Sequence, residues 1–72
     1  MKYIIAANDE VIIFSDSICH KDVADAMGIP VKSAGFFYVS DRQPLCYGKS
    51  ESLGIGSQPS DSDQIGEELM LF

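Results

Sequence analysis

Two runs of β-branched and aromatic residues, residues 2–7 and 10–14, stand on either side of the polar pair Asn8-Asp9. Such runs favour strands, and Asn and Asp tolerate the positive φ angles that a two-residue type I′ turn requires. The pattern therefore predicts a β-hairpin that is apolar on both faces. The expected cross-strand pairs are Tyr3 with Phe14, Ile4 with Ile13, and Ile5 with Ile12.

A helical period follows this hairpin. Ser17 can cap a helix that runs through Met27, and Gly28 followed by Pro30 ends it, because glycine adopts the left-handed C′ conformation and proline cannot continue a helix. The polar side carries Lys21, Asp22 and Asp25. The predicted apolar side consists of Cys19, Val23, Ala26 and Met27.

A second hairpin is predicted from residues 33–39 and 45–48, joined by the polar connection 40–44. Pro44 has no backbone N–H group, so it belongs at a strand start or on the edge of the sheet. Gly35 indicates a bulge or a close approach of the backbone.

Residues 49–60 are rich in Ser, Gly and Pro, which is typical of a connecting loop with turns at Gly54 and Gly56. A second helix follows, with Ser57 or Ser60 as its N-cap. The first helical turn is expected to hold Pro59, Asp61 and Asp63, and the apolar side to consist of Ile65, Leu69 and Phe72.

The element order is ββαββα, which indicates a single α+β domain over residues 1–72 with an antiparallel sheet from two hairpins and two helices. Both hairpins carry apolar side chains on both faces. Either one helix packs on each face, or a second chain supplies the missing layer, and we favour a homodimer because uncovered apolar area commonly marks association.

The chain has 72 residues, 46% of them hydrophobic, with a formal net charge of −6. A charge of this sign repels nucleic acids and anionic lipid surfaces, so we expect neither as a partner. The imbalance is greatest after Ser50, where there is no Lys or Arg. This end is either a solvated face that aids solubility or a surface that binds a basic protein partner. Its acidic residues are Glu51, Asp61, Asp63, Glu67 and Glu68.

No segment reaches the ~18 apolar residues that span a bilayer, and the N-terminal run turns polar too soon for a signal peptide. We therefore expect a cytoplasmic protein. In a reducing compartment Cys19 and Cys46 are expected to be small buried hydrophobic residues without a disulfide.

Candidate catalytic and ligand-binding motifs are incomplete. Gly48-Lys49-Ser50 matches the end of a phosphate-binding P-loop, but Gln43 stands where that motif has its first glycine. Cys19 and His20 are neighbours on the predicted helix and point about 100° apart, so we expect a buried Cys19 and a surface or capping His20. No catalytic residue, cofactor or metal site is predicted.

The aromatic cluster Phe36-Phe37-Tyr38 has no interleaved basic residues, which argues against base stacking. It is interpreted as a core strand, with a protein-contact patch as the alternative.

Three stretches resemble a family of small, uncharacterised proteins encoded by tailed bacteriophages and prophages. They are Ser33-Ala-Gly-Phe, Cys46-Tyr47-Gly48-x-Ser50-Glu51-Ser52-Leu53-Gly54, and Ser57-x-Pro59-x-Asp61. The chain departs from this pattern at Ser60, where the family has an acidic residue. The resemblance implies a small phage product that acts inside a bacterial host, and it implies no activity, cofactor or catalytic residue.

The sequence thus predicts a non-enzymatic interaction protein, a phage or prophage accessory factor that binds a host or phage protein. The alternatives are a self-associating structural or assembly protein, an acidic DNA mimic that inhibits a nucleic-acid enzyme, and a small enzyme that uses Cys19 or Cys46.

Overall fold

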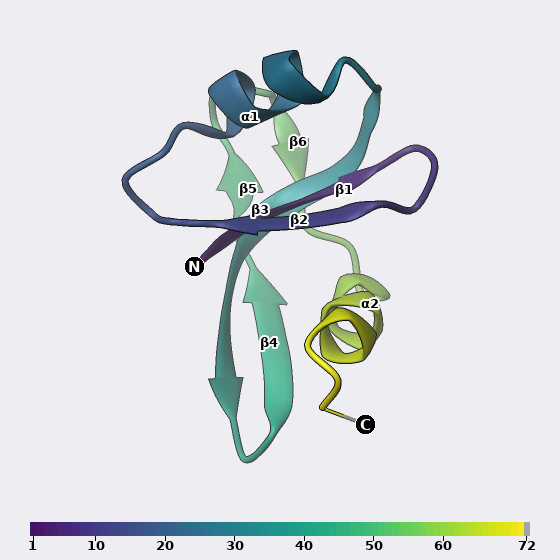
Figure 1. The fold of residues 1–72 in the computed structure, drawn as a ribbon. Coiled ribbons are helices and arrows are strands. Elements are labelled where there is room, and N and C mark those ends of the chain that lie inside the picture. Colours follow the sequence, from purple (N-terminus) through teal and green to yellow (C-terminus); the bar gives the residue numbers. More distant parts are fainter. Residues whose placement is uncertain (72) are drawn as a thin grey trace.

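The computed structural model describes residues 1–71, and the predicted role of Phe72 lies outside these residues. A four-stranded antiparallel sheet with the order β2-β1-β3-β4 carries one helix on each side (Figure 1). The strands are β1 (Lys2–Ala6), β2 (Val11–Phe14), β3 (Val31–Ser40) and β4 (Gln43–Tyr47), and the helices are α1 (His20–Met27) and α2 (Asp61–Glu68). The predicted α+β class is confirmed.

The segment that was expected to be a loop contains a further small hairpin of β5 (Lys49–Ser50) and β6 (Ile55–Gly56). The element order is therefore ββαββββα. The turn at Gly54 is confirmed, with a φ of 68°, whereas Gly56 lies in β6 and forms no turn. Composition indicated a loop here because Ser and Gly are rare in strands.

The first hairpin is present, but its predicted register is wrong by one residue. The observed pairs are Lys2 with Phe14, Tyr3 with Ile13, Ile4 with Ile12, and Ile5 with Val11. The Asp9 N–H donates to the Ala6 carbonyl at 2.8 Å, and Asp9 has a φ of 70°. The loop is therefore a three-residue turn that ends in a left-handed residue. The extra loop residue moves every β2 side chain to the opposite face.

The connection of the second hairpin is shorter than the predicted 40–44, because β3 runs to Ser40 and β4 begins at Gln43, which leaves a two-residue turn. Asp41 and Arg42 have φ angles of 52° and 62°, as a type I′ turn requires. Pro44 is buried in β4, an edge strand, so its predicted placement is confirmed. Gly35 makes the expected close approach, since a Cβ atom there would lie 2.7 Å from the Tyr47 carbonyl oxygen.

The free edge of β4 has no N–H group available for pairing. Ser40 and Gln43 flank the two-residue turn and form a hydrogen-bonded pair, so the peptide groups of Pro44 and Cys46 point away from β3. Pro44 has no N–H group, and the Cys46 N–H donates to the hydroxyl of Ser62 in α2 at 3.3 Å. This edge is closed to a further strand.

The core has two layers, one on each face of the sheet. The layer on the α2 side is built from Tyr3, Ile5, Phe37 and Ile65. The layer on the α1 side is built from Ile4, Phe14 and Ala34, against which Val23, Ala24 and Met27 of α1 pack. One helix covers each face, which was the first of the two arrangements that the sequence left open (Figure 1).

The first helix begins later than predicted. Its N-cap is Cys19 and its first residue is His20, while Gly28 ends it with a φ of 67°, as expected. The burial at the start of this helix is the reverse of the prediction: Cys19 and Ala26 are exposed, and His20 is buried. In α2 the expected core residue Ile65 is buried, whereas Leu69 is exposed. No helix among residues 1–71 is long and apolar enough to cross a membrane.

Candidate protein-interaction surface

One face of the β3–β4 hairpin carries a cluster of large side chains that the fold leaves open to solvent. Alternate residues of a strand share a face, so Phe36 and Tyr38 of β3 lie beside their cross-strand partners Tyr47 and Leu45. Tyr38 is 56% exposed, Tyr47 52% and Leu45 43%. We call these four residues the aromatic face.

The rings of the aromatic face are ordered by one another. Phe36 and Tyr47 stack with their centroids 5.8 Å apart, and Tyr38 meets Tyr47 edge-on at 6.0 Å. The Lys2 ammonium lies 5.9 Å from the centroid of Phe36. Cross-strand aromatic pairs of this kind stabilise the hairpin, so the exposed side chains are held in fixed positions on it.

The aromatic face is bare because neither helix covers this part of the hairpin. On the opposite face, Phe37 and Pro44 are buried, and α2 packs there. On the face of Phe36 and Tyr38, α1 and the β5–β6 hairpin cover the sheet where β1 lies. The β3–β4 hairpin extends beyond this cover (Figure 1).

The acidic residues after Ser50 do not form one surface. Glu51 lies in the β5–β6 hairpin and lines a hollow together with Lys2 and Phe36. Asp63, Glu67 and Glu68 are exposed on α2, which packs on the other face of the sheet. Asp61 is completely buried, so the expectation that it belongs to the exposed acidic surface is wrong.

Asp61 instead joins the second helix to the sheet. Its carboxylate accepts hydrogen bonds from the Tyr3 hydroxyl at 2.5 Å and the Ser33 hydroxyl at 2.9 Å. It also accepts one from the Gln58 backbone N–H at 2.8 Å, just before the start of α2. Burial, followed by the neighbouring Asp61 carboxylate, raises the pKa of Tyr3 above its usual range. The sequence contained one signal for this network, since a buried tyrosine hydroxyl needs a hydrogen-bond partner.

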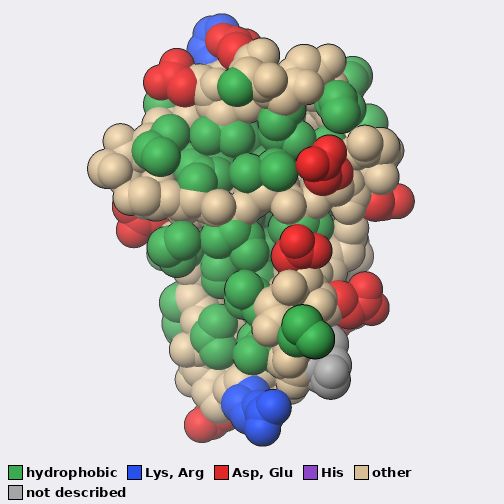
Figure 2. All heavy atoms as spheres, in the orientation of Figure 1, with side chains coloured by type: hydrophobic (Ala, Val, Ile, Leu, Met, Phe, Trp, Pro, Cys, Tyr) green, Lys and Arg blue, Asp and Glu red, His purple; other side chains and the backbone are tan. Residues whose placement is uncertain are grey.

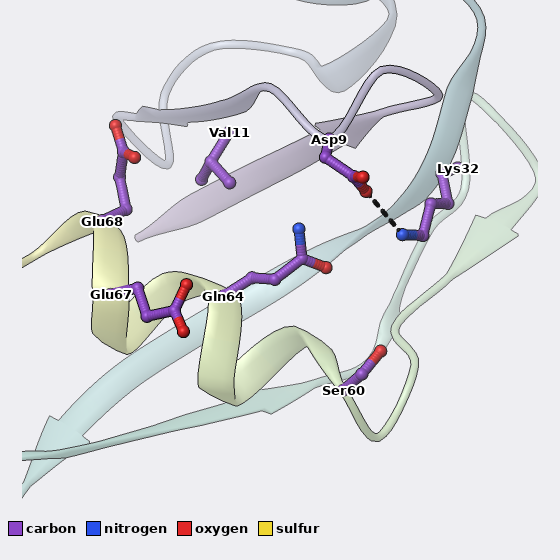
Figure 3. A pocket seen from close by; sticks show the side chains of 7 residues that line it. All are labelled: Asp9, Val11, Lys32, Ser60, Gln64, Glu67 and Glu68. Carbon is purple, nitrogen blue, oxygen red and sulfur yellow. Dashed lines mark hydrogen bonds and ion pairs between the residues drawn. The ribbon is translucent and has the colours of Figure 1, made fainter. Parts of the chain in front are cut away.

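Glu67 and Glu68 border an open hollow of about 580 Å³ between α2, β3 and the β1–β2 turn (Figure 3). The Lys32 ammonium lies 2.7 Å from the Asp9 carboxylate across this hollow. Lys32 holds the pKa of Asp9 below its usual range by hydrogen bonding and charge attraction. The hollow is also lined by Val11, Ser60 and Gln64.

A second hollow of about 470 Å³ lies at the start of α1, where Cys19 is exposed. The Ser52 hydroxyl, and then the backbone N–H groups that begin α1, lower the pKa of the Cys19 thiol. His20 is buried and its Nε2 atom lies 2.9 Å from the Gly35 carbonyl oxygen, between the rings of Phe14 and Phe36. The histidine therefore holds the start of the helix against the sheet.

Cys46 is free and half-buried beside Tyr3, and burial raises the pKa of its thiol. Within residues 1–71, no three His, Cys, Asp or Glu side chains lie together in a way that would hold a metal ion.

The aromatic face is the part of the described surface that has the largest exposed apolar side chains in one place.

No family model matches this chain, and the searches of curated proteins and of solved structures returned no match.

Proposed function

We propose that this chain is a non-enzymatic protein-interaction module that binds another protein through the aromatic face. The observation that carries the proposal is the exposure of Tyr38, Leu45 and Tyr47 side by side on one ordered hairpin. Clustered large apolar side chains on a small protein commonly mark an interaction site.

The composition of the aromatic face suits binding to a protein. Tyrosine is enriched among the residues that dominate interface energies, because it combines a large apolar ring with a hydroxyl that bonds at the rim. The contacts of Tyr47 with Phe36 and Tyr38 restrict the rings before binding. Less side-chain entropy is then lost when a partner docks, which favours affinity.

The exposed acids contribute to this proposal by steering. Glu51 borders the hollow next to Phe36, so it stands at the rim of the aromatic face. Asp63, Glu67 and Glu68 lie behind the sheet and add to the negative field of a chain with a net charge of −6. Charges of this kind accelerate encounter with a basic partner and respond to salt.

The biological setting belongs to the same proposal. The resemblance of residues 33–61 to small proteins of tailed bacteriophages and prophages favours an accessory protein that acts in the bacterial cytoplasm. Its partner would then be a host or phage protein with an apolar docking site and a basic surround.

Affinity capture from a bacterial lysate with matched variants tests the proposal. The double variant Tyr38→Ser/Tyr47→Ser should lose the captured partner, with an affinity reduced by about 30-fold or more, as is typical of residues that dominate an interface. Ile18→Ser is the matched control, because Ile18 is 43% exposed, like Leu45, and lies outside the aromatic face.

Capture that is unchanged by the double variant would contradict the proposal. A captured DNA-binding enzyme that is displaced by DNA, and released by Glu67→Lys/Glu68→Lys but not by the tyrosine variant, would support the acidic DNA mimic instead. Glu67 and Glu68 are exposed, so this second variant leaves the core intact.

A further inference from the structure

The strand β2 forms the edge of the sheet farthest from the aromatic face, and its outward peptide groups are unpaired. The Ala6 N–H donates to the Glu10 carbonyl at 2.9 Å, so these two residues form a hydrogen-bonded pair. Pairs alternate along an antiparallel ladder, so the peptide groups of Ile12 point toward β1. The N–H and C=O groups of Val11 and Ile13 therefore point toward the open edge.

No described residue covers this edge. Among residues 1–71, no backbone or side-chain group bonds to the outward groups of Val11 or Ile13. Open edges of this kind are commonly blocked by a proline, a bulge or a covering loop, as β4 is by Pro44. β2 has only four residues, but it has none of these blocks, so its outward groups are open to another strand.

We propose that β2 pairs antiparallel with β2 of a second copy of this chain, about a two-fold axis at Ile12. Val11 of each copy then lies opposite Ile13 of the other. Each of these two pairs exchanges both of its hydrogen bonds, so every outward group of Val11 and Ile13 is satisfied at once. The spacing of these groups on β2 is complementary to itself, which a two-fold interface requires.

Apolar side chains flank the edge on both sides. Ile12 packs on the α1 side of the sheet, and Val11 and Ile13 pack on the α2 side, and all three are only half-buried. Figure 2 shows hydrophobic side chains gathered in bands across this front of the molecule, with few charges among them. A paired copy would extend both core layers across the new junction.

The charges near β2 also fit a second copy. Asp9, before the strand, is ion-paired with Lys32 at 2.7 Å, and Asp16, after it, is 3.2 Å from the N-terminal ammonium. Among residues 1–71 Glu10 has no such partner, and in this register it faces Phe14 of the other copy rather than an acid.

This inference concerns a surface other than the aromatic face and stands or falls independently of the proposed function. β2 and β4 are opposite edges of the sheet, so pairing through β2 leaves the aromatic face free in both copies. Tyr38→Ser/Tyr47→Ser should therefore leave the dissociation constant of the dimer unchanged.

Sedimentation equilibrium over a concentration series tests the pairing. The wild-type chain should be a reversible dimer. Val11→Pro removes one outward N–H per copy without touching the ladder to β1, and it should raise the dissociation constant about tenfold to a hundredfold. Val11→Ala is the matched control, because it trims the side chain and keeps the N–H, and it should weaken the dimer much less. Far-UV circular dichroism confirms that both variants fold.

Cross-linking tests the register. In the proposed pairing Ile12 faces Ile12 of the other copy in a non-hydrogen-bonded pair, where side chains lie closest. In a background with Cys19→Ser and Cys46→Ala, the Ile12→Cys variant should form a disulfide-linked dimer on mild oxidation. Val11→Cys, whose copies lie diagonally, should do so poorly.

A monomer at every concentration, equal effects of Val11→Pro and Val11→Ala, or equal cross-linking at residues 11 and 12 would each overturn the proposal. A monomer that instead binds an extended peptide along β2 would likewise overturn the assignment of a second copy.

Discussion

Replacing the buried Asp61 with asparagine is the most direct perturbation of the fold. The side chain is completely buried and accepts hydrogen bonds from Tyr3, Ser33 and the Gln58 N–H. Asparagine has nearly the same shape, but one of its two terminal groups is an N–H donor. A hydroxyl can turn to accept from that donor, but the Gln58 N–H cannot. In either orientation of the amide, the remaining bonds lose the negative charge that strengthens them.

The size of the effect follows from these contacts. A hydrogen bond to a charged group contributes about 1.5–3 kcal/mol and one between neutral groups about 0.5–1.5 kcal/mol, so each of the three bonds is weakened by about 1 kcal/mol. We expect Asp61→Asn to lower the free energy of unfolding by about 2–4 kcal/mol. A chain of 72 residues has only about 4–11 kcal/mol in total, so this single change removes a large share of it.

Urea unfolding followed by far-UV circular dichroism measures the change. Asp63→Asn is the matched control, because Asp63 lies in the same first turn of α2 but is exposed. It should lose only the interaction with the helix dipole, at most about 1 kcal/mol. If the two variants are equally stable, Asp61 does not join α2 to the sheet as described. A double-mutant cycle with Tyr3→Phe should show coupling between Tyr3 and Asp61.

Three further predictions concern pH, thiol reactivity and backbone packing. The folded state keeps the proton on Tyr3, whose pKa is raised, whereas the unfolded phenol loses it near pH 10. The free energy of unfolding, measured with urea, should therefore fall above pH 10 by up to about 1.4 kcal/mol per pH unit. An equal slope in Tyr3→Phe would contradict this. Iodoacetamide should alkylate Cys19 before Cys46 at pH 7, and Ser52→Ala should slow the reaction of Cys19 in a timed mass-spectrometric assay. An unchanged rate would show that the Ser52 hydroxyl does not stabilise the Cys19 thiolate. Gly35→Ala places a Cβ atom 2.7 Å from a backbone oxygen, whereas the Cβ atom of Gly56→Ala has its nearest contact at an ordinary 3.5 Å. Gly35→Ala should therefore lower the midpoint of thermal unfolding far more than Gly56→Ala does. Similar midpoints would refute the close approach at Gly35.

Much of the fold could be predicted from the sequence because local signals agreed with it. The runs of residues 2–7 and 33–39 gave strands, and Gly28 gave the end of α1. The register of the first hairpin was not predictable from pattern. Register is specified when one face is apolar and the other polar, and here both faces are apolar, so a slip of one residue leaves the pattern unchanged. The two turns differ at Asn8, because a type I′ turn requires a positive φ there as well as at Asp9, and in the structure only Asp9 of this turn has one.

The site residues were harder to predict, because exposure depends on tertiary packing. The sequence identified Phe36 and Tyr38 as strand residues with a partner in Tyr47 or Leu45, but not that the helices stop short of them. The reversal of Cys19 and His20 has the same origin. The spacing of side chains around a helix is the same wherever it begins, so periodicity alone did not fix which side of α1 faces the sheet. The contacts of His20 with Gly35 and Phe14 fix it, and these are tertiary contacts between separate elements of the chain.

The closed edge of β4 has a consequence for assembly as a whole. A sheet that accepts a strand at both ends can add copies without limit and grow into a fibre, whereas a sheet with one sealed end cannot. In this sheet Pro44, which has no N–H group, and the Ser62 hydroxyl, which accepts the Cys46 N–H, close the edge of β4. If two sheets join through β2, the joining therefore stops at a pair, and Ser62→Ala alone would not extend it, because Pro44 still lacks an N–H group.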